Sequence, residues 1–167
     1  MQQDYAKQGG TREQARPADL MDDSLRIVSA SLARHGIQVI RDYEPSLPDI
    51  TVEKHKVLQI VVNFIRNAKQ ACQSSPQPDR KVTLRVARAN EFVCLTVIDN
   101  GIGISPENLN RLFEHGFTTK ADGHGFGLHS SARVVRELGG DILAQSGGTG
   151  MGASFSLKLP LNGPASK

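Results

Sequence analysis

The chain has 167 residues, of which 38% are hydrophobic and 22% are charged, and its formal net charge is +3. This length suits one domain with its own core, and the composition excludes a disordered tail or a collagen-like fibre. Lys and Arg are scattered without a dense basic run, which argues against nucleic-acid binding. No apolar run approaches the roughly 20 residues of a membrane-spanning helix and no signal peptide opens the chain. We therefore expect a cytoplasmic domain without membrane contact, whose parent protein can still be anchored in a membrane.

The first half of the chain predicts the order helix, strand, helix. Residues 1–16 are polar and contain Gly9-Gly10, so we expect a linker or the end of an upstream element there. Apolar residues recur at helical spacing, and the expected elements are a helix over 19–34, a strand over 37–43 and a long helix over 52–73. We place one domain at 17–161 and a short tail at 162–167.

The second half predicts a sheet with helices stacked on it. Residues 82–87 alternate between apolar and polar, whereas 92–98 are nearly all apolar, which is typical of a strand buried on both faces. Ser105-Pro106-Glu107 predicts a helix start, with the helix running to about residue 114. The remaining expected elements are a helix over about 126–138 and strands over 141–145 and 153–159.

Three amide side chains form a row along one border of the long helix. Gln59, Asn63 and Asn67 are each one turn apart and lie beside its apolar arc. Asparagine is a poor helix former, so this row is unusual for a solvated stripe, which is the alternative interpretation. An amide oxygen is a suitable ligand for Mg²⁺.

Asp99 ends an apolar strand and precedes Asn100, Gly101 and Gly103. A carboxylate there can accept a hydrogen bond from an exocyclic amine, and glycines let a flat base approach the backbone. These features indicate a purine pocket, although an ordinary Asp-Asn-Gly turn remains the alternative.

Glycine is concentrated between residues 101 and 152. Gly123 to Leu128 opens a helix, where free backbone N–H groups can meet phosphate oxygens. The segment fits neither the dinucleotide-binding fingerprint nor the P-loop. Gly147 to Gly152 forms a second glycine loop, for which a plain hairpin turn is the alternative.

Five motifs in this order resemble the catalytic ATP-binding domain of histidine kinases. They are the N box at 57–71, the G1 box at 99–104, the F box at 112–120, the G2 box at 123–128 and the closing glycine motif at 148–155. The resemblance covers about residues 18–160 and implies the Bergerat fold, an α/β two-layer sandwich. In that fold a mixed five-stranded sheet packs against three main helices, and ATP binds with Mg²⁺ under a lid, here about 116–124.

The resemblance also implies roles for particular residues. Asn67 would hold Mg²⁺, Asp99 would bind the adenine amine, and the catalytic set would be Asn63, Asn67 and Lys120. The expected nucleotide contacts are Asn63, Asn67, Lys69, Gln70, Asp99, Gly101, Gly103, Ile104, Phe117, Thr118, Thr119, Gly123, His124, Gly125, Phe126, Gly127, Leu128 and Thr149. The chain departs from its relatives at His124, at Phe126, and at Gln70, where some relatives carry a phosphate-binding lysine.

Asn63 decides between branches of the superfamily. Relatives that hydrolyse ATP carry a glutamate at this position, and a neutral amide cannot act as a general base. The resemblance therefore implies a histidine kinase that transfers the γ-phosphate to a histidine. None of the chain's five histidines is followed by Glu or Asp, as the acceptor usually is. The acceptor is expected on a separate dimeric helical hairpin, of which residues 1–16 would be a remnant, and a response regulator receiver domain is the next partner. A nucleotide sensor without phosphotransfer and an ATPase clamp are the alternatives.

Overall fold

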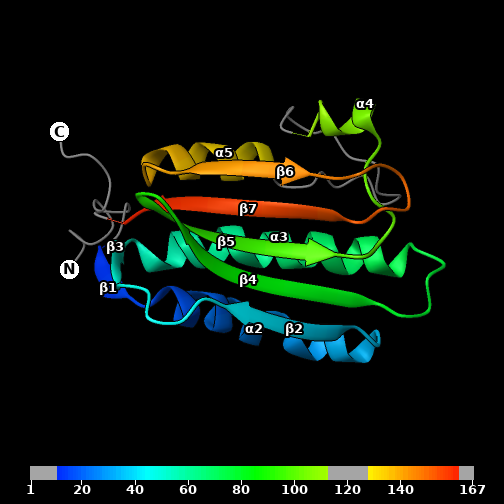
Figure 1. The fold of residues 1–167 in the computed structure, drawn as a ribbon, viewed down its shortest axis with the longest axis horizontal. Helices are drawn as coiled ribbons and strands as arrows, with labels where there is room; N and C mark the ends of the chain where they lie inside the picture. The colour runs from blue at the N-terminus through cyan, green and yellow to red at the C-terminus, as the bar shows by residue number, and fades with distance from the viewer. Residues whose placement is uncertain (1–10, 113–127, 162–167) are drawn as a thin grey trace, which may run out of the picture.

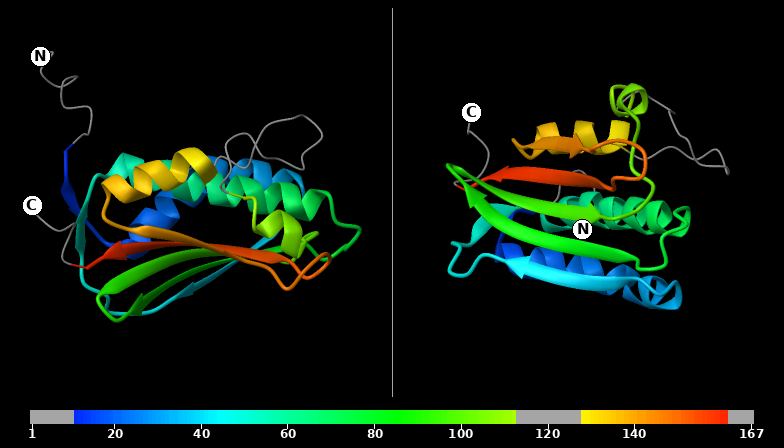
Figure 2. Two further views of the ribbon diagram at one scale, coloured as in Figure 1. Left: turned by 90° about the horizontal axis from the view of Figure 1, so that it is seen from above. Right: turned by 45° about the vertical axis from the view of Figure 1, so that its right-hand side comes forward.

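The computed structural model describes residues 11–112 and 128–161, which form two layers (Figure 1). One layer is a five-stranded sheet with the order β2-β4-β5-β7-β6, and the other consists of helices that cover a single face of it (Figure 2). The strands are β1 (Glu13–Ala15), β2 (Gln38–Tyr43), β3 (Ile50–Val52), β4 (Lys81–Ala89), β5 (Phe92–Asp99), β6 (Asp141–Gln145) and β7 (Ala153–Pro160). The helices are α2 (Pro17–Arg34), α3 (Lys54–Gln73), α4 (Pro106–Leu109) and α5 (Leu128–Glu137).

The five-stranded sheet is mixed, as the sequence predicts. β2 pairs with β4 in parallel, and the pairs β4–β5, β5–β7 and β7–β6 are antiparallel. The three main helices α2, α3 and α5 lie behind the sheet in Figure 1, with α3 crossing its centre. The expected two-layer α/β fold is therefore confirmed for the described residues.

The core lies between the sheet and the helices. Every second side chain of β5 and β7, and of β4 as far as Val86, is buried, because successive residues of a strand point to opposite faces. Phe64 of α3 stacks on Phe155 of β7 with ring centroids 5.6 Å apart. This contact fixes α3 over the middle of the sheet.

The expectation that β5 is buried on both faces is wrong. Val93, Leu95 and Val97 are buried, whereas Phe92, Cys94, Thr96 and Ile98 are only partly so. Among the described residues the sheet has helices on one side only, so the apolar run reflects the strand's central position and not a second covering layer. On the open face the hydroxyls of Thr96 and Ser156 lie 2.9 Å apart.

A small two-stranded sheet precedes α3 and was not expected from the sequence. Residues 13–15 pair antiparallel with residues 50–52, so Val52 belongs to β3 and the long helix begins at Lys54. Strands of three residues are too short to show an alternating pattern, and for this reason residues 13–15 were interpreted as part of a linker.

Two further helices differ from their expected limits. The Ser105 hydroxyl caps α4 by accepting a hydrogen bond of 3.2 Å from the Asn108 amide, as predicted. The helix is short, however, and ends at Leu109. The other, α5, runs from Leu128 to Glu137, and the first two residues expected for it lie outside the described part. Within 11–112 and 128–161, no helix combines the length and apolar character that crossing a membrane requires.

An ion-pair cluster ties the start of α3 to the end of α5. The Lys56 ammonium lies 3.3 Å from the Glu53 carboxylate and 2.9 Å from the Glu137 carboxylate. The first of these pairs is largely buried, so it is less screened than an exposed pair. The start of α3 and the end of α5 are thereby held together.

Candidate nucleotide-binding site

Asp99 lies at the carboxyl end of β5, in the middle of the sheet. It is paired with Val82 on one side and Ala153 on the other, and it is only 5% exposed on the helix-covered face. The Gly101 amide donates a hydrogen bond of 2.8 Å to its carboxylate. Burial raises the pKa of Asp99 to about 6, although the backbone N–H groups of Gly101 and Ala153 act in the opposite direction. Asp99 forms no ion pair within the described residues, so its carboxylate can accept a hydrogen bond from an N–H group of a ligand.

The predicted amide row lies along α3. Asn67 is 6% exposed, Asn63 is partly buried and Gln59 is exposed. A burial gradient along one border of a helix indicates a side that approaches another part of the molecule, and a solvated stripe would be exposed throughout. Asn67, the residue expected to hold Mg²⁺, is therefore the most enclosed of the three.

Gln70 carries a buried polar atom that needs a partner. Its Oε1 is the one buried side-chain oxygen or nitrogen, among the described residues, that lacks a hydrogen bond. An unsatisfied buried acceptor costs about 1–3 kcal/mol, and such a group is usually satisfied by water, an ion or a ligand. Gln70 follows Asn67 by three residues, so the two side chains occupy neighbouring positions on α3. The amide oxygens on this border of α3 can accept hydrogen bonds from a ligand and can coordinate a hard cation.

The loop after Asp99 packs directly on the end of α3. The Ile102 amide donates a hydrogen bond of 3.1 Å to the Ala71 carbonyl oxygen. A Cβ at Gly101 would lie 2.4 Å from the Ala71 carbonyl carbon. Gly101 is therefore required by the contact with the helix, whereas the sequence had suggested that it makes room for a base.

The second glycine loop packs on the first. Gly103 has a φ of +73°, and a Cβ there would lie 2.1 Å from the Gly148 carbonyl oxygen. The Ser146 hydroxyl accepts hydrogen bonds from the amides of Ile104 (3.0 Å) and Gly148 (3.2 Å) and donates one of 2.6 Å to the Gly152 carbonyl. Residues 147–152 do connect β6 to β7, but this hairpin loop also supports the loop that follows Asp99.

Sequence reasoning missed Ser146 and Asn100. The Asn100 side chain accepts a hydrogen bond of 2.9 Å from the Lys81 amide and donates one of 2.6 Å to the Asp79 carbonyl, which fixes the end of β5 to the start of β4. A polar residue between a strand and a glycine run is the available signal for both positions, because such residues commonly bond to nearby backbone.

Three further predicted contacts, Lys69, Leu128 and Thr149, belong to the described residues. The Lys69 ammonium donates a hydrogen bond of 2.9 Å to the Ser31 hydroxyl on α2, which is the other border of α3. Thr149 is exposed, and Leu128 is buried in the core at the start of α5. The lid and the predicted sites Phe117, Thr118, Thr119, Lys120, Gly123, His124, Gly125, Phe126 and Gly127 lie outside the described residues.

The fold and the site define a nucleotide-binding domain of the two-layer α/β kind. A sequence model of the histidine kinase-, DNA gyrase B- and HSP90-like ATPases matches residues 52–163. The chain belongs to this family, and ATP is accordingly its nucleotide.

Several sensor proteins are similar in sequence. The two-component sensor PprA of Pseudomonas aeruginosa is 34% identical over 154 residues, covering 89% of this chain and 16% of PprA. The sensor histidine kinase ZraS of Escherichia coli K12 is 32% identical over 143 residues, covering 86% of this chain and 30% of ZraS. The chain thus spans less than a third of the length of either relative.

Solved structures share the fold. The catalytic domain of the histidine kinase ThkA superposes with a TM-score of 0.78 at 18% identity, covering 91% of this chain and 97% of that one. Full-length ShkA in complex with AMPPNP gives a TM-score of 0.78 at 25% identity, covering 94% of this chain and 32% of ShkA. The architecture of the chain is that of a histidine kinase catalytic domain.

Proposed function

We propose that this chain is the ATP-binding catalytic domain of a two-component sensor histidine kinase, and that it transfers the γ-phosphate of ATP to a histidine on a separate domain. The observation that carries the proposal is the placement of the buried Asp99 carboxylate beside the end of α3, the helix whose border bears Asn63, Asn67 and Gln70. Similarity to PprA and ZraS supports the kinase branch of the family.

Asp99 is proposed to select adenine. Its carboxylate is mostly ionised above its pKa of about 6, and the ionised form accepts a hydrogen bond from the exocyclic amine of adenine. The surrounding burial strengthens this hydrogen bond, because little water competes for the carboxylate.

Asn67 is proposed to contribute an amide oxygen to Mg²⁺, which would place positive charge against the phosphates of ATP. Gln70, next to it on α3, is proposed to accept a hydrogen bond from the bound nucleotide or from its hydration shell, which would satisfy the orphaned Oε1. Asn63 is neutral and cannot take a proton from water, so the chain orients the nucleotide without activating hydrolysis. The γ-phosphate is thereby kept for another nucleophile.

The nucleophile is proposed to be a histidine on a dimeric helical hairpin, and a response regulator receiver domain is proposed to receive the phosphate from it. A structure of ThkA in complex with the response regulator protein TrrA, similar to this chain with a TM-score of 0.76 at 17% identity, is consistent with such a partner. Lys120 is retained in the proposed catalytic set, and because ATP is a cytoplasmic substrate we propose that the domain works in the cytoplasm.

The experiment combines this chain with radiolabelled ATP, Mg²⁺ and a separately prepared phosphoacceptor hairpin from a sensor histidine kinase. We expect acid-labile label on the hairpin, no label on the chain alone, and no label on a hairpin whose histidine is replaced by glutamine. ATP binding without transfer to any hairpin would favour a nucleotide sensor. Rapid phosphate release by the chain alone would favour an ATPase clamp.

A further inference from the structure

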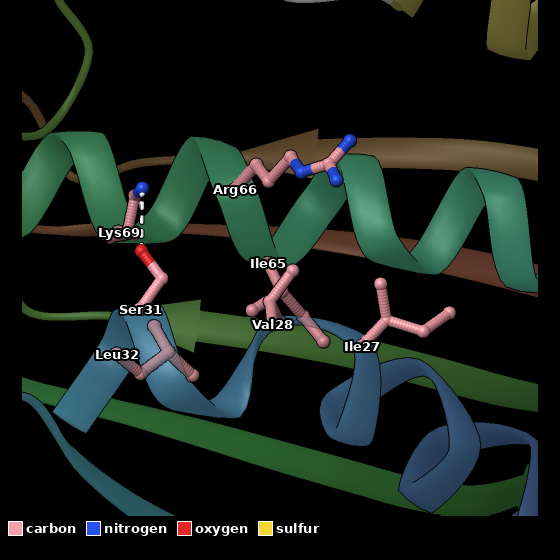
Figure 3. Close-up of a pocket in the computed structure, with 7 residues that line it drawn as sticks. All are labelled: Ile27, Val28, Ser31, Leu32, Ile65, Arg66 and Lys69. Atoms are coloured by element: carbon pink, nitrogen blue, oxygen red, sulfur yellow. Dashed lines mark hydrogen bonds between the residues drawn. The ribbon is translucent and has the colours of Figure 1, made fainter. Parts of the chain in front are cut away.

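A groove of about 260 Å³ lies between α2 and α3, on the border of α3 opposite to the amide row. It is lined by Ile27, Val28, Ser31 and Leu32 from α2 and by Ile65, Arg66 and Lys69 from α3 (Figure 3). The proposed phosphotransfer uses none of its apolar residues.

The floor of the groove is apolar. Val28, Leu32 and Ile65 are buried members of the core that reach the bottom of the groove. Ile27 at the rim is 57% exposed, one of few large apolar side chains left in water on the described surface. Ile27 therefore offers an apolar contact that the domain does not use for its own folding.

The rim of the groove is basic. Arg66 is exposed, and the Lys69 ammonium bonds only to the neutral Ser31 hydroxyl, so neither cation has an acidic partner among the described residues. The acids earlier on α2 are already paired: Asp22 with Arg41, and Asp23 with Arg26 and Lys54. The charge of the rim is left uncompensated within the described part of the chain.

We propose that this groove docks an acidic amphipathic helix from another domain or protein. One apolar side chain of that helix enters the groove beside Ile27, and carboxylates flanking it face Arg66 and Lys69. Two adjacent helices leave a groove that accepts the side chains of a third. Arg66 and Lys69 are three residues apart on α3, which matches the spacing of carboxylates one turn apart on a facing helix. This inference goes beyond the proposed phosphotransfer and does not depend on it.

The test is a titration of the isotopically labelled chain, followed by amide chemical shifts, with a synthetic helical peptide of Glu, Ala and Leu that carries leucines on one face and glutamates beside them. We expect shifts concentrated at residues 27–32 and 65–69. A peptide with lysines in place of the glutamates, and one with serines in place of the leucines, should each bind at least tenfold more weakly.

Variants of the chain locate the interaction. Arg66→Glu combined with Lys69→Glu should weaken the acidic peptide at least tenfold and should strengthen the lysine peptide. Arg133→Glu combined with Arg136→Glu makes the same charge change on exposed positions of α5 and should leave peptide binding unaltered. Ile27→Ser should weaken the acidic peptide without changing ATP affinity. Thermal unfolding checks that each variant is folded.

Three results would overturn the proposal. The first is an absence of shifts at the groove, and the second is equal binding of the acidic and lysine peptides. The third is binding of phosphatidylglycerol vesicles that requires Ile27, Arg66 and Lys69 while the acidic peptide does not bind, since it would make the groove a lipid site.

Discussion

The amide of Ile102 donates a hydrogen bond of 3.1 Å to the carbonyl oxygen of Ala71, which joins the loop after Asp99 to the last turns of α3. This bond connects the two proposed parts of the site, the carboxylate that reads the base and the helix that carries the amide row. The contact is backbone to backbone, so it depends on the absence of a side chain at Gly101. A change at this glycine should therefore disturb both parts together.

Gly101→Ala should destabilise the domain by about 1–3 kcal/mol, because the new methyl group has no room against the Ala71 carbonyl. ATP affinity should fall as well, since the loop can form only by moving away from α3. Urea unfolding and calorimetry measure the two effects. Gly147→Ala is the matched control, because the heavy atoms nearest to a Cβ there all belong to the Met151 side chain, the closest being its Cβ at 3.3 Å, and it should change both quantities much less. Equal effects of the two variants would contradict the packing role of Gly101.

Asn67→Ala should remove the Mg²⁺-dependent part of ATP binding, because the side chain that is proposed to reach the cation is lost. Burial of Asn67 also predicts a loss of stability of about 1–3 kcal/mol, so the variant must be studied below its unfolding temperature. Calorimetry of ATP binding with Mg²⁺ and with a chelator separates the part of the affinity that depends on Mg²⁺ from the part that does not. Gln59→Ala, two turns earlier in the same row and exposed, should behave like the natural chain. A Mg²⁺ effect that survives in Asn67→Ala would refute the metal role.

Asp99→Asn should reduce the preference for ATP over GTP. Adenine presents an amine donor at its six-position and guanine presents a carbonyl acceptor, so an ionised carboxylate attracts one base and opposes the other. A hydrogen bond to a charged group contributes about 1.5–3 kcal/mol, and the natural chain should therefore prefer ATP by a factor on the order of 10² or more. In the variant the amide can turn its N–H₂ toward guanine, so ATP binding weakens and the repulsion disappears. An unchanged ATP/GTP ratio would mean that Asp99 does not read the base.

The same substitution should alter how stability depends on pH. Burial raises the pKa of Asp99 from its ordinary 3.8 to about 6, so between about pH 4 and 6 the folded chain holds a proton that the unfolded chain releases. The contribution of Asp99 to the free energy of unfolding then falls as pH rises through this window. The loss is complete above pH 6 and amounts to on the order of 3 kcal/mol.

Asp99→Asn has no proton to lose at this position, so without nucleotide it should gain stability over the natural chain as pH rises from 4 to 7. Thermal unfolding of both proteins across this range measures the difference. Glu91→Gln alters an exposed carboxyl and should keep the natural profile. A constant difference between Asp99→Asn and the natural chain at all pH values would show that Asp99 is not buried as described.

The sequence predicts the fold well where patterns are long. The 20 residues of α3 and the eight-residue strands β5 and β7 repeat their periods often enough to be recognised, and the glycine motifs place the site on the loops between them. The three-residue strands β1 and β3 carry no such pattern, and only their pairing reveals them.

The site is predicted less completely than the fold. Asp99 and Asn67 could be proposed as site residues because an acid at the end of a strand and an asparagine inside a helix both violate local preference. The direction in which the Lys69 side chain points could not be predicted in this way. It depends on where α2 lies and on the Ser31 hydroxyl that accepts the hydrogen bond of the Lys69 ammonium. The packing of Gly101 on α3 could not be predicted for a similar reason, since a close backbone approach needs both partners to be known.

The pairing of β1 with β3 has a mechanical consequence. β3 ends one residue before Glu53, and α3 begins at Lys54, so the chain leading into residue 13 is fastened to the start of the helix that bears Asn67. The Asp99 loop is bonded to the other end of that helix at Ala71, and a helix of this length spans about 30 Å. A force on the segment that leads into β1 would therefore act at one end of a rigid helix, and the carboxylate proposed to read the base lies at its other end.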